Sequence, residues 1–334
     1  MTRWSGRLAN ATLYTGDSLE VLRALPDGSV RCCVTSPPYW GLRDYGVTGQ
    51  LGLEPTPDAY VARLVEVFRE VRRVLADDGT LWLNLGDSYA ASNASGAQGT
   101  TGQRATRTFT ARTTPKMADG LKPKDLVGIP WRVAFALQAD GWYLRSDIIW
   151  SKPNPMPESV TDRPTKAHEY VFLLSKSERY YYDADAIAEP VTCPDPRMVD
   201  GFVPKSVHGK HSEDKQNSAH RKQDWTGNPT YTGFNGRWSS VEHPPTRNAR
   251  TVWTIPTSPY PGAHFATFPE ELARRCILAG SETGDIVLDP FGGSGTVASI
   301  ATGNGRGAIY IDLNPEYVNL AVERIGPMLC GPNA

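Results

Sequence analysis

A short loop near the start of the chain carries groups that could hold an amino group. The loop is Thr35-Ser36-Pro37-Pro38-Tyr39-Trp40, and it follows an apolar run that ends at Val34. Two consecutive prolines fix the backbone and remove two amide donors, which leaves carbonyl oxygens to accept hydrogen bonds. The Ser36 hydroxyl and the Pro37 carbonyl could accept the two hydrogens of an exocyclic amine, so that its nitrogen can attack an activated methyl group. Tyr39 offers a ring face on which a planar base can stack. A rigid turn is the alternative interpretation.

A glycine-rich loop lies near the other end of the chain. In Val287-Leu288-Asp289-Pro290-Phe291-Gly292-Gly293-Ser294-Gly295-Thr296 an apolar strand enters a turn that opens a helix. Glycines there let the backbone approach a ligand and place amide donors at a helix N-terminus. Asp312 ends the next strand, where an acid in a Rossmann-like sheet binds ribose hydroxyls. The pair indicates an adenosine-containing cofactor, with a tight turn as the alternative. The loop continues to Ala298 where a dinucleotide fingerprint normally has glycine, which does not exclude NAD.

Apolar periodicity around these loops predicts an α/β fold. Strands are expected over 11–14, 30–35, 80–85, 143–150, 169–174, 285–289 and 307–312. Helices are expected over 19–25, 60–75 and 130–139, and after each of the last two strands. The sequence Asp77-Asp78-Gly79 is expected to end the second helix before the strand at 80. Alternating strands and helices favour a mostly parallel sheet with helices on both faces.

Two polar stretches interrupt this pattern. Residues 88–126 are rich in Ser, Thr, Gly and Ala, and their charges are largely basic. Residues 189–250 mix Lys, Arg and His with aromatic residues. Neither stretch has a sustained apolar period, so both are predicted to be insertions into the α/β core. Basic and aromatic side chains suit contacts with phosphates and bases, and a solvated loop is the alternative.

The composition narrows the class of protein. The net charge of −1 over 334 residues argues against a surface coated in positive charge, though not against a local basic groove. No apolar run approaches the roughly 20 residues that span a bilayer, and the N-terminus lacks a signal-peptide pattern, so a cytoplasmic protein without a membrane partner is expected. The cysteines are scattered and form no metal-ligand spacing, so no metal site is predicted. They are Cys32, Cys33, Cys193, Cys276 and Cys330.

The sequences of both loops resemble those of one family, the amino-group DNA methyltransferases that act on cytosine N4 or adenine N6. Asp-Pro-Phe-Gly-Gly-Ser-Gly-Thr at 289–296 is similar to the family's cofactor loop, which implies S-adenosylmethionine as cofactor. The loop at 35–40 resembles the family's catalytic loop, which implies Ser36, Pro37, Pro38 and Tyr39 as catalytic residues. The catalytic loop comes first in the chain, as in the beta class of the family.

The resemblance implies further site residues. The segment 14–19 looks like the family stretch whose acid, here Asp17, contacts the cofactor adenine, and 264–269 looks like the segment that covers the methionine end. Segments 147–155 and 168–172 look like those that line the base pocket. The implied cofactor-binding residues are Asp17, Thr267, Phe268, Asp289, Phe291, Gly292, Gly293, Gly295, Thr296 and Asp312.

The family also implies a fold and a domain plan. The expected fold is a Rossmann-like methyltransferase with a mostly parallel seven-stranded sheet and circularly permuted motif order. Residues 1–188 would form its catalytic part, with a mobile basic loop over 88–126. Residues 189–250 would be an inserted target-recognition region. Residues 251–334 would be the cofactor-binding part of the same domain.

These expectations lead to one functional hypothesis and three alternatives. Ser before the two prolines is typical of cytosine-N4 enzymes, so the hypothesis is methylation of cytosine N4 in a short site of double-stranded DNA, by base flipping and direct transfer. Adenine N6 is the first alternative. A protein amide methyltransferase would normally have Asn at position 36 and the cofactor loop first in the chain. An inactive DNA-binding module is the third. The partners would include a restriction endonuclease in the same cell, and the protein would be a monomer or a homodimer.

Overall fold

The computed structural model describes residues 5–8, 10–42, 44, 46–90, 120–190, 246–257 and 268–326. The chain divides into two compact units, one formed by Met1–Ile187 with Arg250–Ala334 and the other by Ala188–Ala249. In the second unit, β7 (Glu189–Pro190) pairs antiparallel with β8 (Thr246–Arg247). The first unit contains the sheet that carries the candidate site.

Nine strands form the sheet of the first unit in the order β1-β2-β11-β10-β3-β4-β6-β5-β9. The strands are β1 (Ser5–Leu8), β2 (Ala11–Thr15), β3 (Val30–Thr35), β4 (Leu75–Leu85), β5 (Tyr143–Ser151), β6 (His168–Ser175), β9 (Val252–Thr254), β10 (Ile286–Asp289) and β11 (Gly307–Asp312). All seven expected strands are present, and the short β1 and β9 extend the two edges. The α/β fold with a mostly parallel sheet is therefore confirmed.

The strand directions bring the functional loops to one edge. Strands β2, β11, β10, β3 and β4 are parallel, so their carboxyl ends meet at the same edge. Strand β6 is antiparallel to β4 and to β5, so its amino end and the carboxyl end of β5 join them there. The chain proceeds from β3 to β4 in one direction and from β10 to β11 in the other. The boundary between β3 and β10 is thus a topological switch point, where α/β sheets bind ligands.

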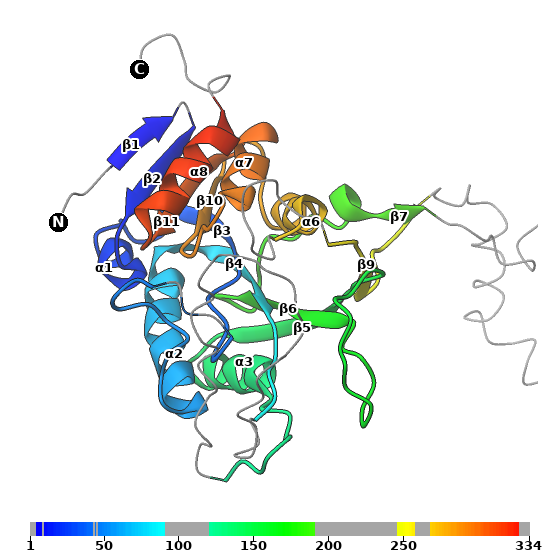
Figure 1. Ribbon diagram of the computed structural model, residues 1–334. Coiled ribbons are helices and arrows are strands. Elements are labelled where there is room, and N and C mark those ends of the chain that lie inside the picture. Colours follow the sequence, from blue (N-terminus) through cyan, green and yellow to red (C-terminus); the bar gives the residue numbers. More distant parts are fainter. Residues whose placement is uncertain are drawn as a thin grey trace, which may run out of the picture. The chain divides into compact units, whose positions relative to one another are not determined.

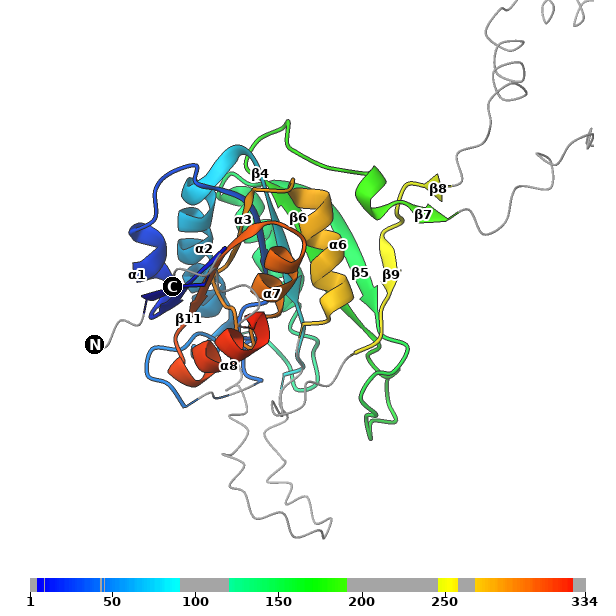
Figure 2. The same ribbon diagram turned by 90° about the horizontal axis from the view of Figure 1, so that it is seen from above.

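Helices cover both faces of the sheet, as Figures 1 and 2 show. The helices are α1 (Ser18–Arg23), α2 (Pro57–Val74), α3 (Ile129–Ala139), α6 (Glu270–Gly280), α7 (Thr296–Gly303) and α8 (Pro315–Ile325), with a 3-10 turn, η1, at Asp185–Ile187. On one face α2 packs between α1 and α3, and on the other α7 packs between α6 and α8. The arrangement buries a continuous apolar core between α1, α2, α3 and the sheet.

Helix α2 shows how local sequence builds one of these layers. Thr56 caps its N-terminus by accepting from the Ala59 amide at 3.1 Å, and Pro57 occupies the first turn, where its missing N–H costs nothing. Its apolar stripe is buried against the sheet, with Tyr60, Leu64 and Phe68 fully enclosed. Tyr60 also donates to the Pro38 carbonyl at 2.7 Å, so the helix holds the loop that follows β3.

The boundary between α2 and β4 differs from the prediction. The helix ends at Val74, and Leu75 is already extended and paired with Val30. The expected turn at residues 77–79 is instead an irregular part of β4, where the register with β3 shifts. A neighbouring segment holds it, because the Gly79 carbonyl accepts from the Lys176 amide at 3.2 Å. Tertiary pairing has overridden a local turn signal.

The predicted basic loop has ends that are built into the fold. Tyr89 forms a β-bridge with Leu126, the Ala90 amide donates to the Asp125 carbonyl at 2.8 Å, and Ala90 is buried. These residues belong to the scaffold beside α3. Residues 91–119 of the predicted loop and 191–245 of the predicted recognition region lie outside the described residues.

Candidate active site

A cavity of about 1370 Å³ opens along the shared edge of the strands. Its walls include both loops identified from the sequence, together with the ends of β4, β5 and β6. Drug-sized ligands usually occupy cavities of roughly 300–1,000 Å³, so this one has room for a cofactor and part of a second molecule. The expected site residues that line it are Asp17, Ser36, Pro37, Pro38, Tyr39, Phe268, Asp289, Phe291, Gly292, Gly293, Thr296 and Asp312.

Bonds on several sides hold the loop after β3. The buried Thr35 donates through Oγ1 to Asp289 Oδ1 at 2.7 Å, which ties the start of this loop to the end of β10. Trp40 Nε1 donates to the Glu54 carbonyl at 2.9 Å, and the Trp40 ring is buried. The Pro38 carbonyl accepts from Tyr60. Of the two proline carbonyls that the sequence left as acceptors, that of Pro38 is therefore engaged within the protein.

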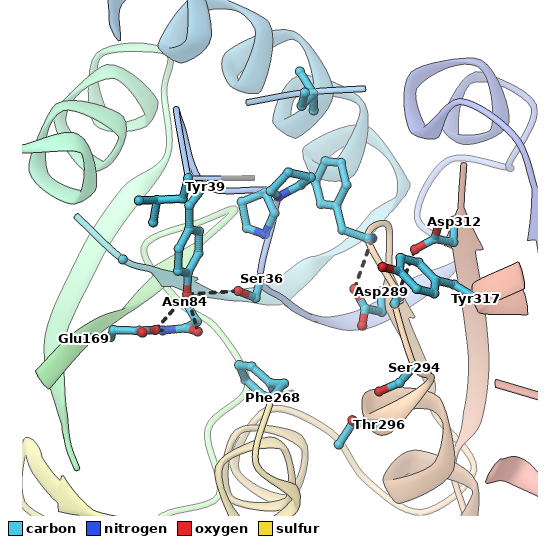
Figure 3. A pocket seen from close by; sticks show the side chains of 18 of the residues that line it. Ser36, Tyr39, Asn84, Glu169, Phe268, Asp289, Ser294, Thr296, Asp312 and Tyr317 are labelled. Carbon is cyan, nitrogen blue, oxygen red and sulfur yellow. Dashed lines mark hydrogen bonds between the residues drawn. The ribbon is translucent and has the colours of Figure 1, made fainter. Parts of the chain in front are cut away.

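Ser36 and Tyr39 belong to a polar cluster at one end of the cavity (Figure 3). Tyr39 Oη lies 3.2 Å from Ser36 Oγ, 3.0 Å from Asn84 Oδ1 and 2.7 Å from Glu169 Oε2. Asn84 Nδ2 donates to Glu169 Oε2 at 3.2 Å and to the Tyr170 carbonyl at 3.1 Å. Burial, followed by the charge of Glu169, raises the pKa of Tyr39 well above its ordinary value, so the phenol keeps its proton.

Two lysines stand beside this cluster. Lys152 forms an ion pair with Glu169 Oε1, and its ammonium lies 4.3 Å from the centroid of the Trp150 ring. Lys166 donates to the Asp87 carbonyl at 3.2 Å and also lines the cavity. Burial lowers the pKa of Lys166, although the charges of Asp87 and Glu169 oppose this effect. This end of the cavity therefore combines hydrogen-bond acceptors with cationic donors.

The glycine loop forms the opposite end of the cavity. Helix α7 begins at Thr296, and its cap residue Gly295 has no side chain to satisfy the first amides. Amides at a helix N-terminus favour polar or anionic ligand atoms. Ser18 Oγ donates to the Pro290 carbonyl at 2.6 Å and fixes the loop against α1. Arg324 of α8 donates to Ser294 Oγ at 3.0 Å and holds the tip of the loop.

The glycines of this loop are required for different reasons. At Gly292 an added Cβ would lie 2.1 Å from the Tyr310 ring, and at Gly295 it would lie 2.7 Å from Ala321 Cβ. Packing against β11 and α8 therefore excludes side chains at both positions. At Gly293 nothing lies within 4 Å of an added Cβ, but the φ of +49° is left-handed. The sequence had assigned all of these glycines to close approach of a ligand.

Two carboxyl groups beside the glycine loop, the buried Asp289 and the half-buried Asp312, have neutral partners. Asp289 is 5% exposed and accepts from Thr35 and from the Phe291 amide at 3.1 Å, and burial raises its pKa to about 7. Asp312 accepts from the Gly293 and Asn314 amides, both at 2.8 Å, and burial raises its pKa to about 6. These two acids favour a ligand that brings positive charge or hydroxyl donors.

The side chains around this part of the cavity fit S-adenosylmethionine. That molecule combines ribose hydroxyls with a sulfonium and an ammonium group, and Asp312 and Asp289 can accept from the hydroxyls and attract the cationic groups. Phe268 points into the cavity between the polar cluster and the glycine loop (Figure 3). Asp17 lines the cavity and also caps α1, accepting from the Glu20 amide at 3.1 Å. The predicted site residue Thr267 lies outside the described residues.

Sequence reasoning did not assign roles to several residues of this cavity. Asn84, Lys152, Lys166 and Glu169 all line it. Lys152 and Glu169 fall in segments that resemble the family's base pocket, but neither was singled out. Asn84 is 2% exposed within the otherwise apolar run 81–85 of β4, and such a buried polar residue near a strand end was the available signal.

Two further features are absent from the described part of the chain. It contains no cluster of three or more His, Cys, Asp or Glu side chains that could hold a metal ion. None of its helices is both long and apolar enough to cross a bilayer.

Comparison with known proteins places this chain in a family. The DNA methylase family model for N6 and N4 methyltransferases matches residues 30–323. The type II methyltransferase M.Cfr9I of Citrobacter freundii is 50% identical over 95% of this chain and 88% of its own length. The type II methyltransferase M.SmaI of Serratia marcescens is 46% identical over 95% of this chain and 91% of its own.

Solved structures agree in fold. A putative DNA modification methylase from Thermus thermophilus in complex with S-adenosylmethionine has a TM-score of 0.55 at 24% identity, covering 96% of this chain and 95% of its own. The PvuII DNA methyltransferase has a TM-score of 0.59 at 20% identity, covering 97% and 88%. The chain therefore belongs to the N6/N4 DNA methylase family, as a DNA methyltransferase of the beta class that uses S-adenosylmethionine.

Proposed function

We propose that the protein methylates the N4 amino group of cytosine within a short site in double-stranded DNA. The observation that carries this proposal is the position of Ser36. It lines a cavity that also includes the cofactor loop, and it stands in a cluster that orients its hydroxyl. A base turned out of the duplex would bring its amino group to Ser36 at one end of the cavity, with the methyl donor at the other.

Ser36 and Pro37 would activate the amine by accepting its two hydrogens. The nitrogen of an exocyclic amine is conjugated to its ring, and acceptors on both hydrogens favour a pyramidal nitrogen with an available lone pair. S-adenosylmethionine, when bound, supplies an activated methyl group on its sulfonium. The residues of this chain then contribute position and electrostatics, and a covalent bond to the protein is not required.

The cationic groups of the pocket suit the O2 acceptor of cytosine. Cytosine carries an O2 acceptor on its ring, whereas adenine has no exocyclic oxygen. An ammonium has three donors, so Lys166 can keep its bond to Asp87 and still donate to that oxygen. Lys152 is a second cation at the same end of the cavity. Ser36 itself is a neutral acceptor, which suits a pocket whose Glu169 already supplies one negative charge.

The cofactor residues divide the work by chemistry. Asp312 would accept from the ribose hydroxyls, Asp17 would contact the adenine, and Asp289 would attract the cationic methionine end. The Gly293 and Thr296 region would present backbone amides, and Phe268 would cover the cofactor from the side of α6. Residues 251–334 thus supply most of the cofactor site, with Asp17 added from the N-terminal part.

DNA contacts would come from the two polar stretches. Residues 189–250 would read the recognition sequence, and the basic residues within 88–126 would close on the phosphate backbone. A restriction endonuclease that cleaves the same unmethylated site is the expected cellular counterpart. A single chain contains both loops of the cavity, so a monomer has a complete site and a homodimer is not needed for the chemistry.

Mass spectrometry of nucleosides tests the proposal. Genomic DNA from a strain without DNA methylation is incubated with protein and S-adenosylmethionine, then hydrolysed. N4-methylcytosine is the expected product. N6-methyladenine alone would overturn the choice of base, and the absence of any methylated nucleoside would overturn the reaction.

A serine pair provides the matched control. Ser36→Ala should reduce turnover by about a hundredfold, the size expected when one preorganised hydrogen-bonding group is lost, without changing cofactor affinity. Ser29→Ala removes a hydroxyl from an exposed turn, where it donates to Pro26, and should leave turnover unchanged. Equal turnover of Ser36→Ala and the wild type would remove Ser36 from the reaction.

A further inference from the structure

Side chains from three separate segments form a continuous line of bonds that ends at Ser36. The line runs from Lys152 after β5 to Glu169 in β6, then to Tyr39, then to Ser36 in the loop after β3. Asn84 in β4 braces it through contacts with both Tyr39 and Glu169. Figure 3 shows Tyr39 pointing with its hydroxyl into this group. All of these contacts join side chains and are separate from the backbone hydrogen bonds of the sheet.

Counting protons fixes the direction of the bond between Ser36 and Tyr39. A phenol has one hydrogen, and two acceptors lie next to Tyr39 Oη, namely Glu169 Oε2 at 2.7 Å and Asn84 Oδ1 at 3.0 Å. The shorter contact to a charged acceptor is the stronger. Since Tyr39 has no second hydrogen, the contact at 3.2 Å must use the hydrogen of Ser36. Ser36 therefore donates to Tyr39, and its lone pairs face other partners.

The surroundings keep this proton arrangement in place. Burial and the charge of Glu169 raise the pKa of Tyr39, so it remains a donor. The Glu169 and Lys152 side chains are only 15% and 17% exposed, and their ion pair fixes the carboxylate beside the Tyr39 hydroxyl. Gly86 leaves space for the Tyr39 ring, because a Cβ there would lie 2.4 Å from Tyr39 Cε2. The ring and its hydroxyl are thus held from two sides.

We propose that Glu169, paired with Lys152, is a positioning residue that acts through Tyr39 to set the Ser36 hydroxyl as an acceptor for the target amine. Without the carboxylate, the phenol keeps only Asn84 Oδ1 and Ser36 Oγ as acceptors, and whenever it donates to Ser36 the hydrogen of Ser36 turns toward the amine. Two donors would face each other, and the nitrogen would lose one of its acceptors. This inference rests on the proposed function of Ser36, but it holds for either target base.

Glu169→Gln tests the first step. Glutamine has a single side-chain oxygen, for which Lys152 and Tyr39 would compete, so Tyr39 would lose its preferred acceptor. The rate of a single turnover with radiolabelled methyl donor should fall about tenfold to a hundredfold, while cofactor affinity stays within twofold of the wild type. Tyr39→Phe removes only the phenolic oxygen and should have an effect of similar size. If Glu169→Gln melts at a lower temperature than the wild type, the single-turnover rate of Tyr39→Phe provides the same test.

Double variants separate positioning from a general structural effect. If Glu169 acts through Tyr39 and Ser36, the Glu169→Gln change should reduce the rate by less than twofold in a Tyr39→Phe or a Ser36→Ala background. A merely structural role would reduce the rate by the same factor in every background. That result, or an unaffected rate in Glu169→Gln itself, would overturn the proposal.

A control variant and the rate of Ser36→Ala distinguish failure of this inference from failure of the proposed function of Ser36. Glu70→Gln removes another paired carboxylate, one that does not line the cavity and pairs with Arg73 at 2.7 Å, and should change the rate by less than twofold. A rate loss equal to that of Glu169→Gln would show a bulk charge effect and contradict the proposal. If Ser36→Ala retains the full rate, the proposed function of Ser36 fails. If Ser36→Ala is slow but Glu169→Gln is not, only the present inference fails.

Discussion

Asp289→Asn should make the cofactor-free protein more stable at pH 8 while weakening its hold on the cofactor. The Asp289 carboxyl is 5% exposed, and its two donors, Thr35 Oγ1 and the Phe291 amide, are both neutral. They soften the cost of burying a charge there but do not cancel it. The site therefore carries an acid that the fold itself does not favour.

The raised pKa of Asp289 gives the size and sign of the effect. Its pKa rises from an ordinary 3.8 to about 7, chiefly through burial. Stability from this group is complete below pH 3.8, where both states are protonated, and is lost as the pH rises through about 7. The loss amounts to about 4 kcal/mol. Asparagine stays neutral and its oxygen can keep both bonds, but its buried NH₂ group costs about 1–2 kcal/mol.

The net gain for Asp289→Asn at pH 8 is thus about 2–3 kcal/mol, or roughly 5–10 °C in melting temperature. Calorimetry or urea unfolding at pH 5, 6.5 and 8, without cofactor, measures it. The gain should shrink toward pH 5. Asp77→Asn is the control, because that side chain is 98% exposed and should show no such gain. A variant no more stable than the wild type at pH 8 would refute the reasoning.

Three other predictions concern the same cavity. Cofactor affinity should fall as the pH drops from 8 to 5.5, because Asp289 and Asp312, with pKa values of about 7 and 6, become protonated and stop attracting a cation. Calorimetric titration should show a dissociation constant about tenfold larger at pH 5.5. A dissociation constant that does not change with pH would contradict this prediction. Gly86→Ala should displace the Tyr39 ring and slow methylation with cofactor binding intact, whereas Gly303→Ala, with no atom within 4 Å of its new Cβ, should not; equal rates would contradict the packing argument. Asp87→Ala should lower the free energy of unfolding in urea by about 1–2 kcal/mol. The reason is that Asp87 Oδ1 accepts from the Gly128 and Ile129 amides at the start of α3, both at 3.0 Å. An unchanged urea midpoint would contradict this prediction.

The parts of the site that follow strands could be predicted from the sequence. Ser36 and Asp312 both come directly after apolar runs, and the carboxyl ends of parallel strands meet at one edge. The order of the loops along the chain then predicted the permuted α/β fold. The glycine loop could be located, but its packing could not, because the contacts of Gly292 with Tyr310 and of Gly295 with Ala321 depend on how α8 and β11 close over it.

The polar cluster depends on register, which the sequence does not specify. Strand β6 lies between β4 and β5 and is antiparallel to both, so Glu169 pairs opposite Trp150 and comes near Asn84. A shift of one residue would turn the Glu169 side chain to the other face of the sheet. Asn84, Glu169 and Tyr39 are separated by 45 to 130 residues along the chain. Only the assembled sheet brings them together.

The two ends of the cavity differ in their attraction for a cation, and this difference bears on the exchange of the cofactor. At the catalytic end the carboxylate of Glu169 is matched by Lys152, so that end has little net attraction for a cation. At the cofactor end Asp289 and Asp312 are bonded only to neutral donors, so a cation is favoured there. Methyl transfer removes the positive charge of the sulfonium. The proposed attraction of Asp289 and Asp312 for the methyl donor would therefore be weaker for the spent cofactor, and this would favour exchange of one for the other after each transfer.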